Sequence, residues 1–291
     1  SGSPGLSGRS IRQRRAPAHD IVAVALEEDA VKSDYTSQNF ILDREVHARI
    51  VAKENAVVAG TRVAEDVFGR IDGSLRVKII RSDGERVKRG ATVMDLQGSA
   101  RSILTGERVA LNFLQRLSGI ATLTRRYVEA AGTRHTKILD TRKTTPGLRA
   151  LEKGAVIAGG GMNHRFGLDD MVMIKDNHLL ATGDPARLQG AIRKFRTLHK
   201  GVRIEVEADT LRQVQSFLRM DGIDIILLDN MSVREMRAAV KLGRGRVRFE
   251  ASGGVTLRRV RKIAATGVDF ISVGALTHSA PAIDYTLEIL L

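Results

Sequence analysis

After Gly132, the chain alternates short apolar runs of strand type with longer segments of helical periodicity. This alternation is typical of βα repeats around a parallel sheet. Six strands are expected, at residues 137–141, 171–175, 203–207, 223–229, 247–251 and 270–274. Helices are expected at residues 186–198, 211–220, 233–242 and 257–266. A series of this length predicts a (β/α) barrel, and an open doubly wound sheet is the alternative.

The part of the chain before Gly132 predicts a separate domain. Residues 21–29 have the periodicity of an amphipathic helix, and residues 48–59 alternate as a strand that ends at Gly60. Residues 100–131 have helical spacing that Ser118 and Gly119 interrupt, so we expect two helices that meet at a bend.

These patterns divide the chain into three parts. Residues 1–15 are rich in Gly, Ser and Pro and then in Arg, which predicts a disordered leader or an expression remnant. Residues 16–131 are expected to form the N-terminal domain. Residues 132–279 are expected to form the barrel domain.

The composition narrows the function. The 291-residue chain has no cysteine, which excludes thiolate catalysis, iron–sulfur clusters and cysteine-ligated zinc and fits a reducing compartment. Its apolar stretches are short, so no membrane span is expected and a cytoplasmic location is the default. The net charge of +14 points to acidic partners, either nucleic acid or small polyanionic substrates. Aromatic residues make up only 4% and tryptophan is absent, which argues against a nucleic-acid-binding protein.

Polar residues and glycines follow the expected strands. The carboxyl ends of parallel strands meet at one edge of a sheet, and active sites of barrels and open sheets lie there. The residues at or just past these ends are Arg142, Lys143, Lys175, Asp176, Glu207, Asp229, Ser252, Gly253, Gly254 and Gly274. The pattern therefore predicts a site along one rim.

The basic residues of this rim suit an anionic ligand. Arg142 and Lys143 stand together, where mutual repulsion is unfavourable without an anion beside them, although a solvated basic pair is the alternative. Arg165 follows three glycines, and its fork suits a carboxylate. His164 either donates to the same ligand or orders the loop. For His178, a structural role is favoured over a metal site.

The acidic residues and the later glycines predict a second half of the site. Glu207 and Asp229 end neighbouring strands and suit Mg²⁺ or sugar hydroxyls, whereas Asp229 is alternatively a cap of the next helix. Glu205 is expected to be structural. Residues 252–254 and Gly274 offer backbone N–H groups and a helix N-terminus to a phosphate, or else simply permit tight turns.

Together these motifs resemble those of the quinolinate phosphoribosyltransferases, also called nicotinate-nucleotide pyrophosphorylases (carboxylating). The resemblance extends from about Glu28 to the C-terminus. It is carried by residues 107–108, 111–112, 117–122, 139–149, 159–165, 174–178, 205–207, 228–230, 251–254 and 273–277.

The resemblance implies an N-terminal α/β sandwich domain, against which residues 280–291 pack, and a C-terminal α/β barrel. That barrel is usually seven-stranded and incompletely closed, which leaves one strand beyond the six expected here. It also implies a homodimer in which Arg108 reaches the neighbouring site. The implied reaction is Mg²⁺-dependent transfer of phosphoribose from phosphoribosyl pyrophosphate to quinolinate. The products are nicotinate mononucleotide, pyrophosphate and CO₂, in de novo NAD biosynthesis.

The resemblance also assigns roles to residues of this chain. It implies that quinolinate is bound by Arg108, Arg142, His164, Arg165 and Lys175. Lys143 would lie where the two substrates meet and, with Glu207 and Asp229, form the catalytic group, the two carboxylates also serving ribose and Mg²⁺. The 5-phosphate would be bound by Ser252, Gly253, Gly254 and Gly274.

One departure from the family and two competing functions stay open. The family usually has an aromatic and a basic residue in the helix before the triple glycine, where this chain has Gly154 and Ile157. Glycine there weakens the helix by roughly 0.5 to 1 kcal/mol relative to alanine. The competing functions are a phosphoribosyltransferase acting on nicotinate or another ring acid, and a basic nucleic-acid-binding protein. Two adjacent ring carboxylates justify the large cationic cluster better than one does.

Overall fold

The computed structural model describes residues 20–175 and 185–290, and the expected leader lies outside them. The chain divides into two compact units. Of the described residues, the barrel unit contains 126–143, 161–175 and 185–275, and the N-terminal unit contains 20–125, 144–160 and 276–290. No described helix has both the length and the apolar character that a membrane crossing needs.

The barrel unit is built on a six-stranded parallel sheet in the order β6-β11-β10-β9-β8-β7. The strands are β6 (Lys137–Leu139), β7 (Val172–Ile174), β8 (Ile204–Ala208), β9 (Ile225–Asp229), β10 (Arg248–Ser252) and β11 (Phe270–Ser272). All six expected strands are confirmed. Because β6 and β7 are the two edges, the barrel is not closed.

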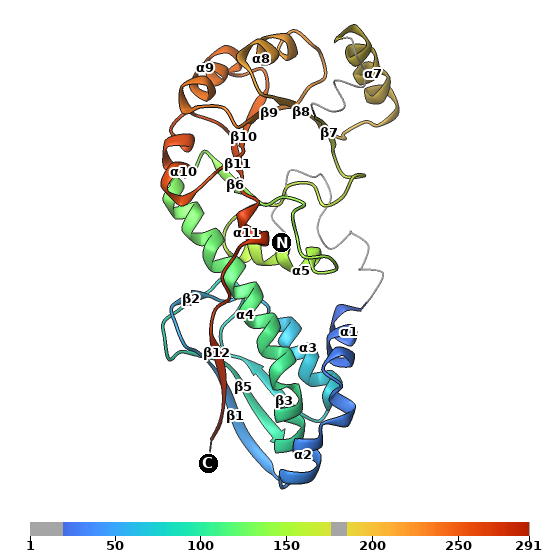
Figure 1. Ribbon diagram of the computed structural model, residues 1–291, viewed down its shortest axis with the longest axis vertical. Coiled ribbons are helices and arrows are strands. Elements are labelled where there is room, and N and C mark those ends of the chain that lie inside the picture. The colour runs from blue at the N-terminus through green and yellow to red at the C-terminus, as the bar shows by residue number, and fades with distance from the viewer. Residues whose placement is uncertain (1–19, 176–184, 291) are drawn as a thin grey trace. The chain divides into compact units, whose positions relative to one another are not determined.

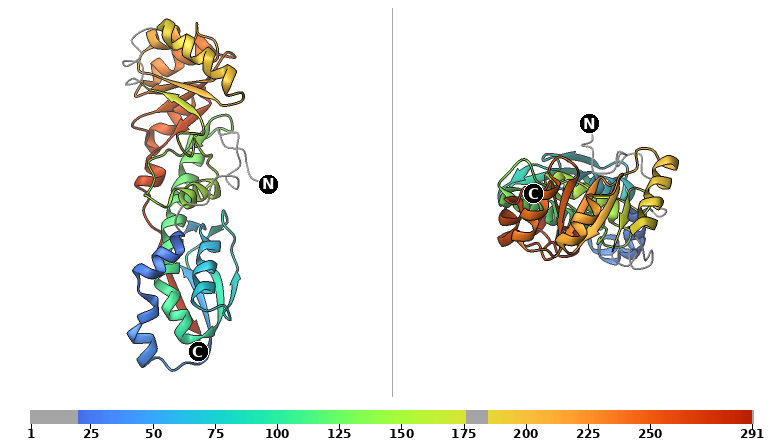
Figure 2. Two further views of the ribbon diagram at one scale, coloured as in Figure 1. Left: turned by 90° about the vertical axis from the view of Figure 1, so that its right-hand side faces the viewer. Right: turned by 90° about the horizontal axis from the view of Figure 1, so that it is seen from above.

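Helices follow the strands and cover the outer face of the curved sheet, as Figures 1 and 2 show. They are α7 (Pro185–Leu198), α8 (Leu211–Phe217), α9 (Val233–Gly243) and α10 (Leu257–Ala264). Helices α8 and α9 each begin with a capping box, built on Thr210 with Gln213 and on Ser232 with Glu235. Residues 225–228 are all buried, as expected for a parallel strand covered on both faces.

A seventh strand is reduced to a single residue pair. Met162 forms an isolated parallel bridge with Leu139 of β6. Its N–H donates to Ile138 O at 2.8 Å, and its carbonyl accepts from Asp140 N at 3.2 Å. Met162 directly follows the triple glycine, of which Gly160 has a φ of +86°. This bridge extends the described sheet beyond β6, at the place where a further strand would pair.

The N-terminal unit is built on a four-stranded antiparallel sheet in the order β12-β1-β5-β3. These strands are β1 (Glu45–Ala52), β3 (Arg76–Ile79), β5 (Thr92–Ser99) and β12 (Tyr285–Leu290), and a smaller sheet pairs β2 (Ala56–Val57) with β4 (Arg86–Val87). The expected strand at residues 48–59 thus ends at Ala52 and resumes as β2. The C-terminal strand β12 pairs with β1, where His47 lies opposite Leu290.

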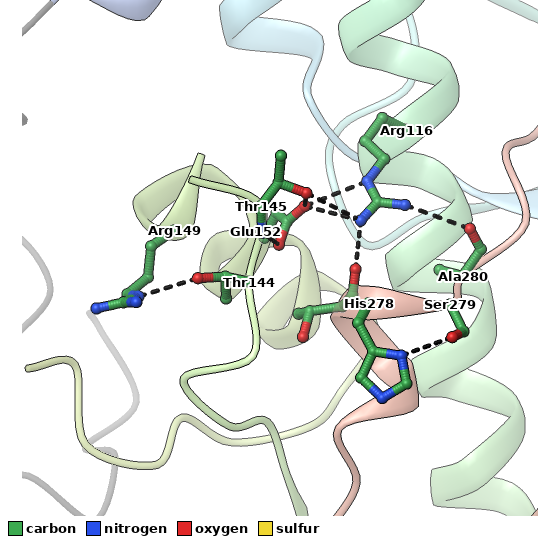
Figure 3. A network of polar contacts seen from close by, with 9 residues as sticks. Arg116, Thr144, Thr145, Arg149, Glu152, His278, Ser279 and Ala280 are labelled. Atoms are coloured by element: carbon green, nitrogen blue, oxygen red, sulfur yellow. Dashed lines mark hydrogen bonds and ion pairs between the residues drawn. The ribbon is translucent and has the colours of Figure 1, made fainter. Parts of the chain in front are cut away.

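Helices pack the apolar face of this sheet into a core around Ile50, Phe68, Leu96 and Leu114, all of which are at most 1% exposed. The helices are α1 (Ile21–Glu28), the 3₁₀ turn η2 (Val31–Ser33), α2 (Tyr35–Phe40), α3 (Thr61–Ile71), α4 (Ala100–Ala131) and α5 (Arg149–Ala158), and α11 (Ala275–His278) follows β11. A polar network around Arg116 and Glu152 joins α4 to α5 inside this unit (Figure 3).

The expected bend in residues 100–131 is wrong, because α4 is one continuous helix of 32 residues. The glycine serves close packing instead. A Cβ at Gly119 would lie 2.1 Å from Pro281 O, so only glycine lets this segment approach the helix. Ser118 Oγ accepts the N–H of Ala59 at 3.0 Å. Ser118 and Gly119, which suggest a helix break in the sequence, are therefore the place where other segments pack against an unbroken helix.

Candidate active site

Side chains with charge or hydrogen-bonding capacity gather at the carboxyl ends of the barrel strands. Because all six strands are parallel, these ends share one edge of the sheet. The residues that follow or end β6 to β11 there are Arg142, Lys143, Lys175, Glu207, Asp229, Ser252 and Gly274. All of them belong to the barrel unit. The rim expected from the strand order is therefore present as a structural feature.

Three carboxylates meet at one point of this rim. Oxygen atoms of Glu207, Asp209 and Asp229 lie within 4.8 Å of one another. Glu207 and Asp229 are half-buried and Asp209 is exposed. An all-oxygen set of this kind suits a hard divalent cation that keeps part of its water shell. Asp209 was not predicted from the sequence. The signal was present, because Asp209 directly follows a strand that ends in Val-Glu-Ala and so lies at the same edge of the sheet as Glu207.

The alternative that Asp229 caps the next helix is wrong. The N-cap of α9 is Ser232, whose side chain accepts from Glu235 N, and Glu235 in turn accepts from Ser232 N at 2.8 Å. Asp229 instead accepts a hydrogen bond from Asn230 Nδ2 at 2.8 Å. Its carboxylate is therefore available at the rim rather than used in the helix start.

Lys175 is a basic residue that lies next to the acidic side of the rim. Its Nζ lies 3.4 Å from Glu207 Oε2, and its side chain is 49% exposed. An ion pair this exposed contributes little to stability. The ion pair instead fixes a position, because it places the ammonium group that follows β7 beside the carboxylate cluster. Residues 176–178, which include His178, lie outside the described residues.

Two arginines of the rim, Arg142 and Arg165, are near enough for their charges to interact. Arg165 is 8% exposed, and its Nη1 donates to Met171 O at 3.3 Å. Burial, followed by the positive charge of Arg142, lowers the pKa of Arg165 below its ordinary value. Each of these causes disfavours a second positive charge at this place. An anion bound between the two guanidinium groups relieves both.

Asp140 anchors the loop that carries Arg165. This carboxylate is fully buried. Its Oδ1 accepts the backbone N–H of His164 at 2.9 Å, and its Oδ2 accepts from Asn163 Nδ2 at 2.6 Å. Asp140 lies directly after β6 and two residues before Arg142, so it fixes both arginine-bearing segments to one strand end. Sequence reasoning gave Asp140 no role, although a carboxylate that ends an apolar strand is a signal for one.

His164 faces the protein interior rather than the rim. It is 4% exposed, and its Nδ1 accepts the backbone N–H of Arg165 at 2.7 Å. Its Nε2 lies 3.1 Å from Glu205 Oε2 and 3.3 Å from Glu250 Oε2. Burial lowers the pKa of His164, whereas the charges of Glu250 and Glu205 raise it. Of the two roles open to His164, this geometry favours ordering of the loop.

Glu205 and Glu250 are both fully buried and both face His164. They come from β8 and β10, which flank β9 in the sheet. Burial, followed by the charge of Glu250, raises the pKa of Glu205 to about 7. The structural role expected for Glu205 has its partner in His164, and Glu250 is a second such residue that sequence reasoning missed.

The turn after β10 requires its glycines. Gly253 and Gly254 have φ angles of +86° and +56°, a region that residues with a Cβ rarely adopt. A Cβ at Gly253 would also lie 2.1 Å from Asn230 Oδ1. Asn230 N donates to Ser252 O at 3.0 Å, so the turns after β9 and β10 are tied together. Backbone groups of residues 252–254 thus lie next to Asp229, which is paired with Ser252 in the register.

Arg108 belongs to the N-terminal unit. It is exposed on α4, and its connection to the rim stays a prediction.

The chain matches two family models over most of its length. The quinolinate phosphoribosyl transferase N-terminal domain matches residues 34–118, and the corresponding C-terminal domain matches residues 120–288. A probable nicotinate-nucleotide pyrophosphorylase (carboxylating) of Synechocystis is 45% identical over 91% of this chain and 90% of its own length. A mitochondrial quinolinate phosphoribosyltransferase (decarboxylating) of Nicotiana glauca is 43% identical over 94% of this chain and 84% of its own.

Solved structures agree with the sequence relatives. The nicotinate-nucleotide pyrophosphorylase of Francisella tularensis superimposes with a TM-score of 0.87 at 38% identity, covering 93% of this chain and 95% of that one. A structure from Streptococcus pyogenes gives a TM-score of 0.86 at 42% identity, covering 94% and 96%. Matches in both domains, at this identity and coverage, place the protein among enzymes with this fold. The chain belongs to the quinolinate phosphoribosyltransferase family.

Proposed function

We propose that this enzyme transfers phosphoribose from phosphoribosyl pyrophosphate to quinolinate and removes CO₂, a step of de novo NAD biosynthesis. The observation that carries the proposal is the division of one rim into two halves. The neighbouring guanidinium groups of Arg142 and Arg165 suit a dicarboxylate, and the cluster of Glu207, Asp209 and Asp229 suits a cation that accompanies a pyrophosphate.

The quinolinate half is proposed to use three cations. Arg142 and Arg165 bind the adjacent ring carboxylates, because planar forks match carboxylates in pairs. Lys175 lies beside the acidic cluster, 3.4 Å from Glu207. Arg108 would add a fourth charge from a second subunit. A cluster this large exceeds what one ring carboxylate needs.

The phosphoribosyl half is proposed to use the acidic cluster and the glycine turn. Glu207 and Asp229, with Asp209 beside them, would hold Mg²⁺ directly or through water, and their three carboxylates fit that ion. When bound, Mg²⁺ supplies positive charge that stabilises the departing pyrophosphate. Residues 252–254 and Gly274 would hold the 5-phosphate through backbone N–H groups.

The reaction follows from these placements. The pyridine nitrogen forms a bond to C1 of the ribose as the bond from C1 to the pyrophosphate oxygen breaks. Lys143, exposed at the end of β6, would stabilise negative charge where the two substrates meet. Positive charge on the ring nitrogen then lets the adjacent carboxylate leave as CO₂, and the electron pair left on the ring carbon takes up a proton. No protein nucleophile is required, in keeping with a chain that has no cysteine.

A homodimer is part of the proposal. Three large apolar side chains within one short stretch of the N-terminal unit are exposed, Tyr35 by 79%, Phe40 by 83% and Leu42 by 77%. Such a group marks an interaction surface, and a second copy of the chain is the simplest partner. Arg108 is also exposed and therefore able to contact that copy. A cytoplasmic location is proposed as well, on the cysteine-free composition.

A product assay tests the proposal. The purified enzyme receives phosphoribosyl pyrophosphate and Mg²⁺ with quinolinate labelled in the carboxylate next to the ring nitrogen, and release of labelled CO₂ is measured together with nicotinate mononucleotide. Equal amounts of both products are expected. Parallel reactions with nicotinate serve as the control, since one carboxylate leaves half of the arginine pair unused. Turnover of nicotinate without turnover of quinolinate would overturn the proposal.

A further inference from the structure

The side chain of His164 is enclosed by protein on both ring edges. Its Nδ1 accepts the Arg165 N–H at 2.7 Å, and its Nε2 faces Glu205 and Glu250 at 3.1 and 3.3 Å. Both glutamates are fully buried, and the imidazole is 4% exposed. A ring with partners on both nitrogens has no nitrogen left for a substrate. Its chemistry is therefore directed at the protein itself.

The hydrogen bond from Arg165 fixes the form of the ring. A nitrogen that accepts a hydrogen bond carries a lone pair, so the proton of the neutral imidazole must lie on Nε2. The two glutamates by themselves favour the charged ring, in which Nδ1 also bears a proton. In the charged form, the proton on Nδ1 and the proton of the Arg165 N–H would both lie in the 2.7 Å gap between the two nitrogens. The contact therefore requires the neutral ring.

The hydrogen bond from Arg165 to Nδ1 also excludes a metal ion as the function of this cluster. His164, Glu205 and Glu250 bring ligand atoms within 4.8 Å of one another, as a metal site does. A cation on Nε2 would require the proton to leave that nitrogen and move to Nδ1. The Arg165 amide would then lose its acceptor.

The backbone of His164 is held as firmly as its ring. Its N–H donates to Asp140 Oδ1 at 2.9 Å, and Asp140 is fully buried. His164 thus contacts three parts of the sheet: Asp140, directly after β6, Glu205 within β8 and Glu250 within β10. It connects them to the one residue that follows it. That residue is Arg165, whose guanidinium is near Arg142.

We propose that His164 is a positioning residue: anchored by Glu205 and Glu250, it holds the backbone amide of Arg165 and so sets where the Arg165 guanidinium lies relative to Arg142. The inference rests on the proposed function only for its kinetic readout. Spacing between two guanidinium groups matters for a ligand with two adjacent carboxylates. His164 therefore acts on quinolinate affinity through Arg165 rather than by touching the substrate.

Two conservative substitutions separate this role from direct substrate contact. The Oδ1 atom of asparagine takes the place of Nδ1 and can still accept the Arg165 N–H, whereas the amide of glutamine reaches the place of Nε2 instead. We therefore compare His164→Ala, His164→Asn and His164→Gln. Phe249→Leu is the matched control for lost stability, because Phe249 neighbours Glu250 on β10 but faces Gly243 of α9.

The expected kinetic result is specific. His164→Ala raises KM for quinolinate about tenfold, the effect of one lost hydrogen bond, while KM for phosphoribosyl pyrophosphate changes less than about twofold. His164→Asn restores quinolinate KM to near the parent value, and His164→Gln does not. Phe249→Leu lowers the unfolding midpoint without this selective change. Rescue by glutamine in place of asparagine, rescue by neither, or an unchanged KM in His164→Ala would overturn the inference.

Two further measurements do not depend on turnover. NMR of ¹⁵N-histidine protein is expected to show one ring with a protonated Nε2 and an unprotonated, hydrogen-bonded Nδ1. Hydrogen exchange of the Arg165 amide is expected to be slow in the parent and in His164→Asn and faster in His164→Ala. A His164 ring protonated on both nitrogens, or equal exchange in all three proteins, contradicts the positioning role. Failure of the product assay with these results intact would overturn the proposed function alone.

Discussion

Arg116 and Glu152 form an ion pair in which the carboxylate is fully buried and the guanidinium is 30% exposed, with Nη2 2.9 Å from Oε1 (Figure 3). Glu152 also accepts from the backbone N and from Oγ1 of Thr145, at 3.1 and 2.8 Å. Arg116 donates in addition to the carbonyl oxygens of Thr277 and Ala280. One pair thereby joins α4 and α5 to the segment that leads into β12.

Arg116→Ala is expected to lower the free energy of unfolding by about 3–5 kcal/mol, because it leaves a buried charge without its partner. Urea denaturation measures the loss. The control is Arg62→Ala, which removes an ion pair of similar length, 2.8 Å to Glu65, from a side chain that is 80% exposed. That substitution should cost less than about 1 kcal/mol. Equal losses in the two variants would contradict the account of the buried pair.

Gly154→Ala is expected to raise the free energy of unfolding by about 0.5–1 kcal/mol, because alanine restricts the unfolded chain and favours helix. Gly154 lies inside α5, and an added Cβ there meets no atom within 4 Å. Gly159 at the end of the same helix is the contrast, since its Cβ would lie 2.5 Å from Ala121 O. Gly159→Ala should therefore destabilise. Thermal unfolding of both variants checks the prediction, and a loss of stability in Gly154→Ala contradicts it.

Asp229→Asn is expected to raise the Mg²⁺ concentration that gives half-maximal activity by about tenfold, because one anionic ligand is lost from the cluster. Asp209→Asn should have a smaller effect in the same direction, since Asp209 is exposed. Asp221→Asn is the control, because that carboxylate is 84% exposed and pairs with Arg193. Mg²⁺ titrations of initial rate compare the three. An unchanged requirement in Asp229→Asn would remove Asp229 from the proposed metal site.

Mixing two inactive variants tests the shared site. Arg108→Ala and Lys143→Ala each disable a proposed binding group, but a hybrid dimer would contain one site with both groups intact. Random exchange of subunits then restores about one quarter of parent activity, because half of the dimers are hybrids with one working site each. The control is Arg108→Ala mixed with itself. No recovery, after exchange is shown by mass-tagged subunits, contradicts a contribution of Arg108 from the neighbour.

The fold was predictable where the pattern is local. Runs such as residues 225–228 are apolar on both faces, and this identifies buried parallel strands without knowledge of their neighbours. The continuity of α4 at Gly119 was not predictable, because this glycine packs against Pro281, more than 160 positions later in the sequence. A glycine that breaks a helix and a glycine that admits a neighbour have the same sequence appearance.

The site divides in the same way. Strand order alone places Glu207 and Asp229 on one rim, because parallel strands end at one edge. The direction of His164 depends on two glutamates from distant strands, and a residue beside Arg165 gives no sign that its ring faces inward. The place of Asp140 after an apolar strand was visible in the sequence, but its contact with Asn163 was not, since the two residues are 23 positions apart.

Tyr285→Phe tests the buried end of the N-terminal core. The Tyr285 hydroxyl donates to Ser118 Oγ at 3.0 Å, and burial raises the pKa of Tyr285 to about 12. At pH 7 the variant is expected to lose about 1 kcal/mol, the contribution of one hydrogen bond.

The stability difference between Tyr285→Phe and the parent should shrink with alkali. Below about pH 10 the phenol is protonated in both the folded and the unfolded parent, so it adds no pH dependence. Between pH 10 and the folded pKa near 12, the unfolded chain releases the proton that the folded chain keeps, so parent stability falls by up to about 1.4 kcal/mol per pH unit. The variant lacks this loss, and the other titrating groups are common to both proteins. Urea denaturation from pH 8 to 11.5 measures the difference. Parallel curves would show that Tyr285 titrates alike in both states.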